Sequence, residues 1–469
     1  MKTDFTKLDR AFNPQCIAVV GESKRNDFAW LRTQSTFKGK LYSVQVNPET
    51  IKDIKALGVE NHTSLLDIPE PVDLAIIVVP RTVAPMILDD CIRKEVAAAH
   101  FFTSGFAETS SEEGIRLERL LTERAEEANF HIIGPNCMGI FNPGIGIRQM
   151  DKQYTGLTGP VGFIGQSGGL AINFSMEAHL QGVDINKSVS FGNGFVLDSA
   201  DFLSYFADDP EIKVIGMYLE GVKDGRRFFK VLREISARKP VVIWKGGRTE
   251  EGGRAIASHT GSLAMPQVIW DAAVRQCGAI SVTNLNELID TTKALLYFPP
   301  VHGDRVAMVV GGGGLAVSSA DECAEAGLRL PSLTRESYDE LATFFSLVGG
   351  YYNNPIDIGN DNRKEIKRIM GILERDANID NLVLLLSIGF GTTKQFQNEI
   401  NSMTDIRKRA PKPVMAIIPF SSPKEMRRAG EITQKFQDHD VPAFPSIKRG
   451  ARALKNTLDY YSFKSSIDT

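Results

Sequence analysis

One histidine lies in a stretch of the chain that has few bulky side chains. His259, one of seven histidines, belongs to the segment GGRTEEGGRAIASHTGSLA, which runs from Gly246 to Ala264. Glycine allows backbone conformations that other residues do not reach. We interpret this segment as a mobile loop whose imidazole is a nucleophile that accepts and carries a phosphoryl group. The alternative is a polar surface histidine in an ordinary loop.

A carboxylate is predicted at the end of a buried strand nearby in the sequence. Glu220 closes the apolar run VIGMYLE and precedes Gly221, so we expect it at the carboxyl edge of a parallel sheet. There it can accept a proton from one imidazole nitrogen and leave the other nitrogen nucleophilic. The alternative is a solvated residue at the rim of the sheet.

The run GQSGGLAINFSMEAHL, from Gly165 to Leu180, predicts a strand, a glycine turn and a helix. The first amides of a helix have no partner within it and lie at the positive end of its dipole, so they bind anions. We therefore predict that Ser167, Gly168 and Gly169 bind phosphate. The same letters match the GxSxG nucleophile elbow of serine hydrolases, with Ser167 as the nucleophile.

The first strand and turn, VVGESKR, lack the glycine spacing of a dinucleotide-binding turn, and the second strand ends in Val46-Asn47-Pro48 without a carboxylate. The turn therefore suits a phosphorylated ligand other than NAD, or it is a solvated basic turn. No GxxxxGK[ST] motif occurs in the sequence. We expect another chain to supply any nucleotide.

Short apolar runs alternate with amphipathic stretches along the whole chain, which predicts parallel sheets covered by helices. The chain is 469 residues long, which indicates several domains. We predict three α/β domains, at 1–145, 156–299 and 300–469. Their strands are expected in CIAVVG, LYSVQVNP, LAIIVVP, AAHFFTSG and HIIGPN, then in PVGFIGQ, VIGMYLEG, PVVIWKGG and ISV, and finally in RVAMVVGGGG, VLLLSIG and VMAIIPF.

The composition excludes several classes of function. The net charge of −3 is dispersed, so no nucleic-acid or membrane surface is expected. No apolar run is long enough for a bilayer, and the first residues, MKTDFTKLDRAF, lack the apolar segment that a signal peptide would have. Five scattered cysteines without a CxxC pair indicate reduced thiols and no metal site. We expect a cytoplasmic protein.

Over its full length the sequence resembles a known family, the α subunits of NDP-forming acyl-CoA synthetases (ADP-forming acetate–CoA ligases), which are related to the succinyl-CoA synthetase α subunit. The motifs that carry this resemblance are IIGPNCMGIFNP, VGFIGQSGGLA, FADDPEIKVIGMYLEGVKDGRRF, KPVVIWKGGRTEEGGRAIASHTGSLA and NPIDIGN. The resemblance implies a Rossmann-like CoA-binding domain followed by two flavodoxin-like doubly wound domains, of which the last contacts a partner.

The resemblance also implies roles for individual residues. His259 is the residue phosphorylated in turnover, Glu220 orients it, and the turn from Ser167 to Gly169 holds the phosphate. Coenzyme A is expected to bind in the first domain, at Gly21, Ser23, Asn47, Pro48, Val79, Pro80, Ser104, Gly105 and Asn136.

The reaction implied is the interconversion of acyl-CoA, phosphate and ADP with a carboxylic acid, CoA and ATP, through an acyl phosphate and a phosphohistidine. ATP or ADP with Mg²⁺ is expected on a separate ATP-grasp β subunit, in an α2β2 assembly. The alternatives are a non-catalytic CoA-binding regulatory protein of the same fold and a serine hydrolase at Ser167.

The sequence departs from the family between residues 22 and 40. Members usually continue the first turn as GAS and then PGK, whereas this chain reads GESKRNDFAWLRTQSTFKGK. Phe28, Trp30 and Leu31 are expected to add bulk where CoA or the acyl chain approaches, which suggests a substrate other than acetate. Cys137 lies near the expected site, and we interpret it as a buried structural thiol.

Overall fold

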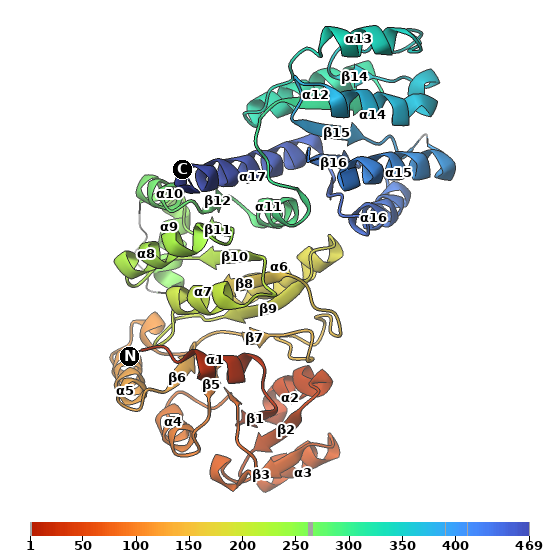
Figure 1. The fold of residues 1–469 in the computed structure, drawn as a ribbon. Coiled ribbons are helices and arrows are strands. Elements are labelled where there is room, and N and C mark those ends of the chain that lie inside the picture. Colours follow the sequence, from red (N-terminus) through yellow and green to blue (C-terminus); the bar gives the residue numbers. More distant parts are fainter. Residues whose placement is uncertain (1, 261–265, 390, 410, 469) are drawn as a thin grey trace. The chain divides into compact units, whose positions relative to one another are not determined.

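The computed structural model describes residues 2–260, 266–389, 391–409 and 411–468. They fall into two compact units, Met1–Thr283 and Asn284–Thr469. Within the described residues the first unit contains two sheets and the second unit contains one (Figure 1).

The first sheet is wholly parallel, with strand order β3-β2-β1-β4-β5-β6. This is the order of the Rossmann fold, which reverses direction between β1 and β4. The strands are β1 (Cys16–Val20), β2 (Lys40–Val44), β3 (Glu60–His62), β4 (Leu74–Ile77), β5 (Ala98–Phe101) and β6 (His131–Ile133). The helices are α1 (Phe5–Phe12), α2 (Ala29–Thr33), α3 (Pro48–Ala56), α4 (Ala84–Arg93) and α5 (Glu112–Glu127).

Strand β1 shows why its sequence is a continuous apolar run. Successive side chains of a strand point to opposite faces. Ile17 and Val19 belong to one hydrophobic cluster, whereas Ala18 and Val20 belong to another. Both faces of the sheet are therefore covered, as parallel sheets require.

The second sheet has the order β12-β11-β10-β8-β9-β7, parallel except for β7, which pairs antiparallel with β9. Its parallel strands follow the flavodoxin order 2-1-3-4-5. The strands are β7 (Gly139–Phe141), β8 (Val161–Gly165), β9 (Ile185–Ser190), β10 (Val214–Leu219), β11 (Val241–Lys245) and β12 (Ile280–Val282). The helices are α6 (Gly168–Leu180), α7 (Ser199–Asp208), α8 (Gly225–Ser236), α9 (Glu250–Thr260) and α10 (Gln267–Gln276).

The second unit repeats the flavodoxin order in a parallel sheet, β14-β13-β15-β16-β17. Its strands are β13 (Val306–Val310), β14 (Ile356–Asp357), β15 (Asn381–Leu385), β16 (Val414–Ile417) and β17 (Ala443–Phe444). Its helices are α11 (Leu285–Tyr297), α12 (Gly313–Glu325), α13 (Arg335–Ala342), α14 (Ile366–Arg375), α15 (Thr393–Arg409), α16 (Pro423–Gln437) and α17 (Ile447–Asp468).

The predicted fold class, α/β with one Rossmann-like and two flavodoxin-like sheets, is confirmed, and every strand that the sequence predicts is present. The limits 1–145, 156–299 and 300–469 stay a prediction. Two elements pack outside the domains predicted for them. Strand β7 lies within 1–145 but joins the second sheet, and helix α11 lies within 156–299 but contacts α17. In the described part of the chain, no helix has the length and apolar character needed to span a membrane.

Candidate active site

The residues predicted to bind CoA all follow strands of the first sheet at its carboxyl edge. Parallel strands present these ends on one side, and the point where the strand order reverses is the usual ligand crevice. The residues follow β1 (Gly21 and Ser23), β2 (Asn47 and Pro48), β4 (Val79 and Pro80), β5 (Ser104 and Gly105) and β6 (Asn136). The fold therefore gathers all nine at one edge, and their contacts with CoA stay a prediction.

The turns after β1 and β4 approach each other closely at this edge. Gly21 has φ +91°, and a methyl group on its Cα would lie 2.5 Å from Val79 Cγ1. The Gly21 amide donates to the carbonyl of Val44 at 3.0 Å. Only glycine fits this turn without strain, because its φ is positive and its Cα packs against the neighbouring turn.

A Gly21→Ala variant is therefore expected to lose stability and CoA affinity together. Positive φ costs a non-glycine residue about 1–3 kcal/mol, and Val79 must also move. The matched control is Gly58→Ala, at φ +78° with open space around the added methyl. Thermal unfolding and calorimetric CoA titration measure both effects. Equal losses in the two variants would contradict a role for crowding at Val79.

Asn47 has a structural role at the start of α3. Its Oδ1 atom accepts from the amides of Glu49 at 3.0 Å and Thr50 at 3.2 Å. This is the usual N-cap arrangement, and Pro48 occupies the first helical position, where proline is favoured. The cap keeps the start of α3 at the edge of the sheet.

The structure corrects the expectation for the divergent turn after β1. Phe28, Trp30 and Leu31 do not add bulk at the ligand edge, because each is at most 5% exposed and belongs to the hydrophobic core. Glu22 is fully buried, and its Oε2 accepts from the amides of Trp30 at 2.8 Å and Leu31 at 3.2 Å. Burial raises the pKa of Glu22, and these hydrogen bonds oppose the shift. The inward carboxylate thus holds α2 against the core.

Cys137 is confirmed as a buried thiol. It is 4% exposed, and burial raises its pKa to about 12. A thiol with that pKa is protonated at neutral pH and is a poor nucleophile. It therefore packs as a small apolar side chain.

A carboxylate that the sequence analysis did not single out links the two sheets of the first unit. Glu108 accepts from the amides of Gly105 at 2.6 Å and Phe106 at 3.0 Å, and from Asn193 Nδ2 at 2.8 Å. Asn193 in turn accepts from Asn136 Nδ2 at 3.4 Å. The loop after β5 is therefore bonded to the loop after β9, next to two predicted CoA-binding residues. No sequence pattern marks this link, because Asn193 lies 85 residues from Glu108 in the chain.

The predicted phosphate turn opens α6. Ser167 is the N-cap of α6, and its Oγ accepts from the amide of Leu170 at 3.5 Å. Gly168 packs on Met138, where a methyl group would lie 2.5 Å from Cγ, whereas Gly169 is exposed with nothing within 4 Å of an added methyl. The helix start is therefore accessible to an anion at Gly169.

The same geometry disfavours a serine hydrolase. The nucleophile elbow of those enzymes holds its serine on a sharp, strained turn. Ser167 has φ −94° and ψ 130°, an ordinary extended conformation, and its oxygen caps the helix. The structure thus assigns Ser167 to the helix start.

Glu220 lies directly after β10, as predicted, and is 5% exposed. Its Oε1 accepts from the hydroxyl of Tyr218 at 3.4 Å. Its amide donates to Gln166 Oε1 at 2.8 Å, and its carbonyl accepts from Lys245 Nζ at 2.7 Å. Glu220 is therefore a buried carboxylate at the carboxyl edge of the second sheet, beside the turn that starts α6.

His259 is described only in part. Its backbone belongs to α9 (Glu250–Thr260), whereas its side chain and residues 261–265 lie outside the described residues. The prediction of a loop is wrong for residues 250–260. Acidic residues in the first turn of a helix interact favourably with its dipole, and Glu250 also pairs with Arg254 at 2.9 Å. Helix α9 contacts the short helix η4 (Ala107–Thr109), which follows the predicted CoA-binding loop after β5.

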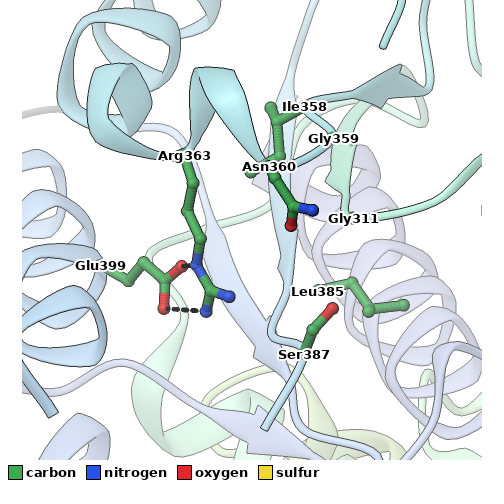
Figure 2. A pocket seen from close by; sticks show the side chains of 8 residues that line it. All are labelled: Gly311, Ile358, Gly359, Asn360, Arg363, Leu385, Ser387 and Glu399. Atoms are coloured by element: carbon green, nitrogen blue, oxygen red, sulfur yellow. Dashed lines mark hydrogen bonds and ion pairs between the residues drawn. The ribbon is translucent and has the colours of Figure 1, made fainter. Parts of the chain in front are cut away.

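The second unit has a small polar pocket at the carboxyl ends of β13, β14 and β15 (Figure 2). Its lining includes the ion pair between Arg363 Nε and Glu399 Oε1, which is 2.9 Å long and almost fully buried. The cavity of about 50 Å³ has room for a few waters and is too small for CoA. It is lined by Gly311, Ile358, Gly359, Asn360, Arg363, Leu385, Ser387 and Glu399.

Two models of known protein families match the chain, one after the other along its sequence. The model described as a CoA binding domain matches residues 15–143, and the model described as a succinyl-CoA ligase like flavodoxin domain matches residues 158–295. The α subunit of ADP-forming acetate–CoA ligase II from Pyrococcus furiosus is 35% identical over 441 residues, which cover 91% of this chain and 93% of that protein.

Two further relatives extend the match. ADP-forming acetate–CoA ligase I from Archaeoglobus fulgidus is 36% identical over 384 residues, which cover 81% of this chain and 55% of that protein. The solved structure of dinucleotide forming acetyl-coenzyme A synthetase 1 from Ca. Korarchaeum cryptofilum, in complex with phosphate and ADP, has a TM-score of 0.84. It is 29% identical, and the match covers 98% of this chain and 99% of that one.

A CoA binding domain on a Rossmann-type sheet, followed by a succinyl-CoA ligase like flavodoxin domain, places the chain in the succinyl-CoA ligase class of proteins. Within that class, the chain belongs to the family of ADP-forming acetate–CoA ligase α subunits. It is thus the α subunit of an NDP-forming acyl-CoA synthetase, an acid–thiol ligase.

Proposed function

We propose that the chain interconverts acyl-CoA, phosphate and ADP with a carboxylic acid, CoA and ATP, and that His259 carries the phosphoryl group. The observation that supports this best is the contact between Glu220 and the start of α6. The side chain of Gln166, immediately before Ser167, binds the amide of Glu220 at 2.8 Å. An anion at the α6 start therefore lies close to a carboxylate that can orient an imidazole.

The chemistry begins at the thioester. A phosphate oxygen attacks the carbonyl carbon, the C–S bond breaks, and CoA leaves as a thiolate that takes up the proton released by phosphate. The first sheet holds CoA at its carboxyl edge through Gly21, Ser23, Asn47, Pro48, Val79, Pro80, Ser104, Gly105 and Asn136. The product is an acyl phosphate at the start of α6.

The phosphoryl group then moves to His259. One imidazole nitrogen attacks phosphorus, the P–O bond to the acyl group breaks, and the acid leaves as a carboxylate. Glu220 accepts the hydrogen bond of the other imidazole nitrogen, and the amides at Ser167, Gly168 and Gly169 neutralise the oxygens on phosphorus. In the last step an oxygen of ADP attacks the phosphorus, and the P–N bond breaks.

ADP is proposed to bind on a partner. The Pyrococcus furiosus relative is named as an α subunit, and the Archaeoglobus fulgidus relative is a longer chain of which the match covers 55%. We propose an ATP-grasp β subunit that holds ADP or ATP with Mg²⁺, in an α2β2 assembly in the cytoplasm. The five free, buried cysteines are compatible with a reducing compartment.

The activity is tested with a panel of thioesters. Acetyl-CoA and longer acyl-CoAs are incubated with the chain and inorganic phosphate, and free CoA is measured as a thiol. At least one thioester is expected to release CoA only when phosphate is present. In the absence of ADP, the amount of CoA released should be near one equivalent per chain. Release that does not depend on phosphate would indicate a hydrolase. Binding of CoA without release from any thioester would indicate the non-catalytic alternative.

A further inference from the structure

Two buried side chains hold the peptide of Glu220 from opposite sides. Gln166 Oε1 accepts from the amides of Glu220 at 2.8 Å and Gly221 at 3.1 Å. Lys245 Nζ donates to the carbonyl of Glu220 at 2.7 Å. Gln166 is 8% exposed and Lys245 is 1% exposed, so neither contact is weakened by water. Both backbone groups of Glu220 are therefore bonded to side chains.

These side chains come from the two strands that flank β10. The sheet order is β11-β10-β8. Gln166 follows the last residue of β8, and Lys245 is the last residue of β11. Gln166 also immediately precedes Ser167, the N-cap of α6. One contact thus joins the Glu220 peptide directly to the predicted phosphate turn.

Pairing of the strands does not require the lysine. The backbones of β10 and β11 already pair in register, with Leu219 opposite Lys245. The ammonium group also donates to the carbonyl of Gly246 at 2.6 Å and lies 5.7 Å from the centre of the Trp270 ring. Burial lowers the pKa of Lys245, and the charge of Glu220 opposes the shift. Burying a charge costs more than burying an apolar side chain of the same size, so strand pairing alone does not explain a lysine at this position.

We infer that Gln166 and Lys245 are positioning residues for Glu220. They fix the two peptide groups on either side of its Cα atom, and with them the direction of its carboxylate relative to the start of α6. This inference rests on the proposed function of Glu220 in phosphoryl transfer. Gln166 and Lys245 act through Glu220 and do not touch the reacting atoms.

The first test is a double-mutant cycle between Gln166 and Glu220. Gln166→Met keeps the size of the side chain and removes the strong acceptor. It is expected to lower the rate of phosphohistidine formation by about 10- to 100-fold, the effect of a misplaced catalytic group. In a Glu220→Gln background the same change is expected to cost less than about 2-fold, because a residue that acts only through Glu220 has nothing left to position.

The second test compares two buried lysines. Lys293 in the second unit is also 1% exposed, donates to the carbonyl of Ala443 at 3.1 Å and lies 5.5 Å from the Phe444 ring. Lys245→Met is expected to slow phosphohistidine formation at least about 10-fold without changing CoA affinity. Lys293→Met is expected to lower the melting temperature and leave that rate unchanged.

The outcomes separate the inference from the function on which it rests. If Gln166→Met and Lys245→Met cost as much with Glu220→Gln as without it, the two residues do not act through Glu220 and the inference is overturned. If Glu220→Gln alone leaves the rate of phosphohistidine formation unchanged, the proposed role of Glu220 fails instead. If Lys293→Met slows the rate as much as Lys245→Met, the effect of Lys245 is general destabilisation, which also overturns the inference.

Discussion

A His259→Ala variant is expected to form no phosphoenzyme and to lose the overall reaction by at least about 10³-fold. Alanine has no nitrogen that can attack phosphorus, so the step from acyl phosphate to protein is removed and not merely slowed. The wild-type chain, incubated with a reactive thioester and radiolabelled phosphate, should acquire a label that is lost in acid and stable in base. The variant should remain unlabelled.

CoA affinity separates this effect from unfolding. The residues proposed to bind CoA lie on loops of the first sheet, whereas His259 lies on α9. Calorimetric titration of His259→Ala with CoA should give the wild-type dissociation constant. The control is His302→Ala, which removes an exposed imidazole of the second unit and should leave labelling intact. Retention of label by the His259 variant would reject the phosphohistidine.

The fold was predictable because buried parallel strands have continuous apolar sequences. CIAVV and VAMVV are recognisable alone, since both of their faces are covered. Strand β9, with the sequence INKSVS, was missed because Asn186, Lys187 and Ser188 resemble a loop. All of its residues are nevertheless buried, and Lys187 pairs with Asp209. Only the folded structure provides that partner.

The positions of the candidate site residues were predictable only where a reactive side chain directly follows an apolar strand. Glu220 could be placed because a carboxylate directly follows an apolar run. The function of Glu22 could not, since a single sequence does not tell whether a carboxylate in a turn faces solvent or the core. The hydrophobic residues Trp30 and Leu31 were misplaced for the same reason, because their direction depends on the hydrogen bonds of their amides to Glu22. The helix at 250–260 was missed because its glycines outweighed the favourable charges of its first turn.

A Gly169→Asp variant is expected to lose activity while keeping or gaining stability. Gly169 is the second residue of α6, and nothing lies within 4 Å of an added methyl. A carboxylate in the first turn of a helix stabilises it by about 0.3–1 kcal/mol, and aspartate also costs less backbone entropy than glycine. The same carboxylate occupies the place proposed for phosphate and repels it. Phosphoryl transfer should fall by roughly 10²-fold or more, as when a group that stabilises a transition state is lost.

The opposite signs of the two effects make the prediction specific, because a damaged fold would lower both quantities. Gly169→Asn is the matched control, with a side chain of the same size and no charge, and it should retain most of the activity. Raising the phosphate concentration should partly restore the rate of Gly169→Asp, since the added charge acts on phosphate binding. If the aspartate variant is stable and fully active, the start of α6 does not bind phosphate. The phosphate that attacks the thioester carbon must then be held elsewhere.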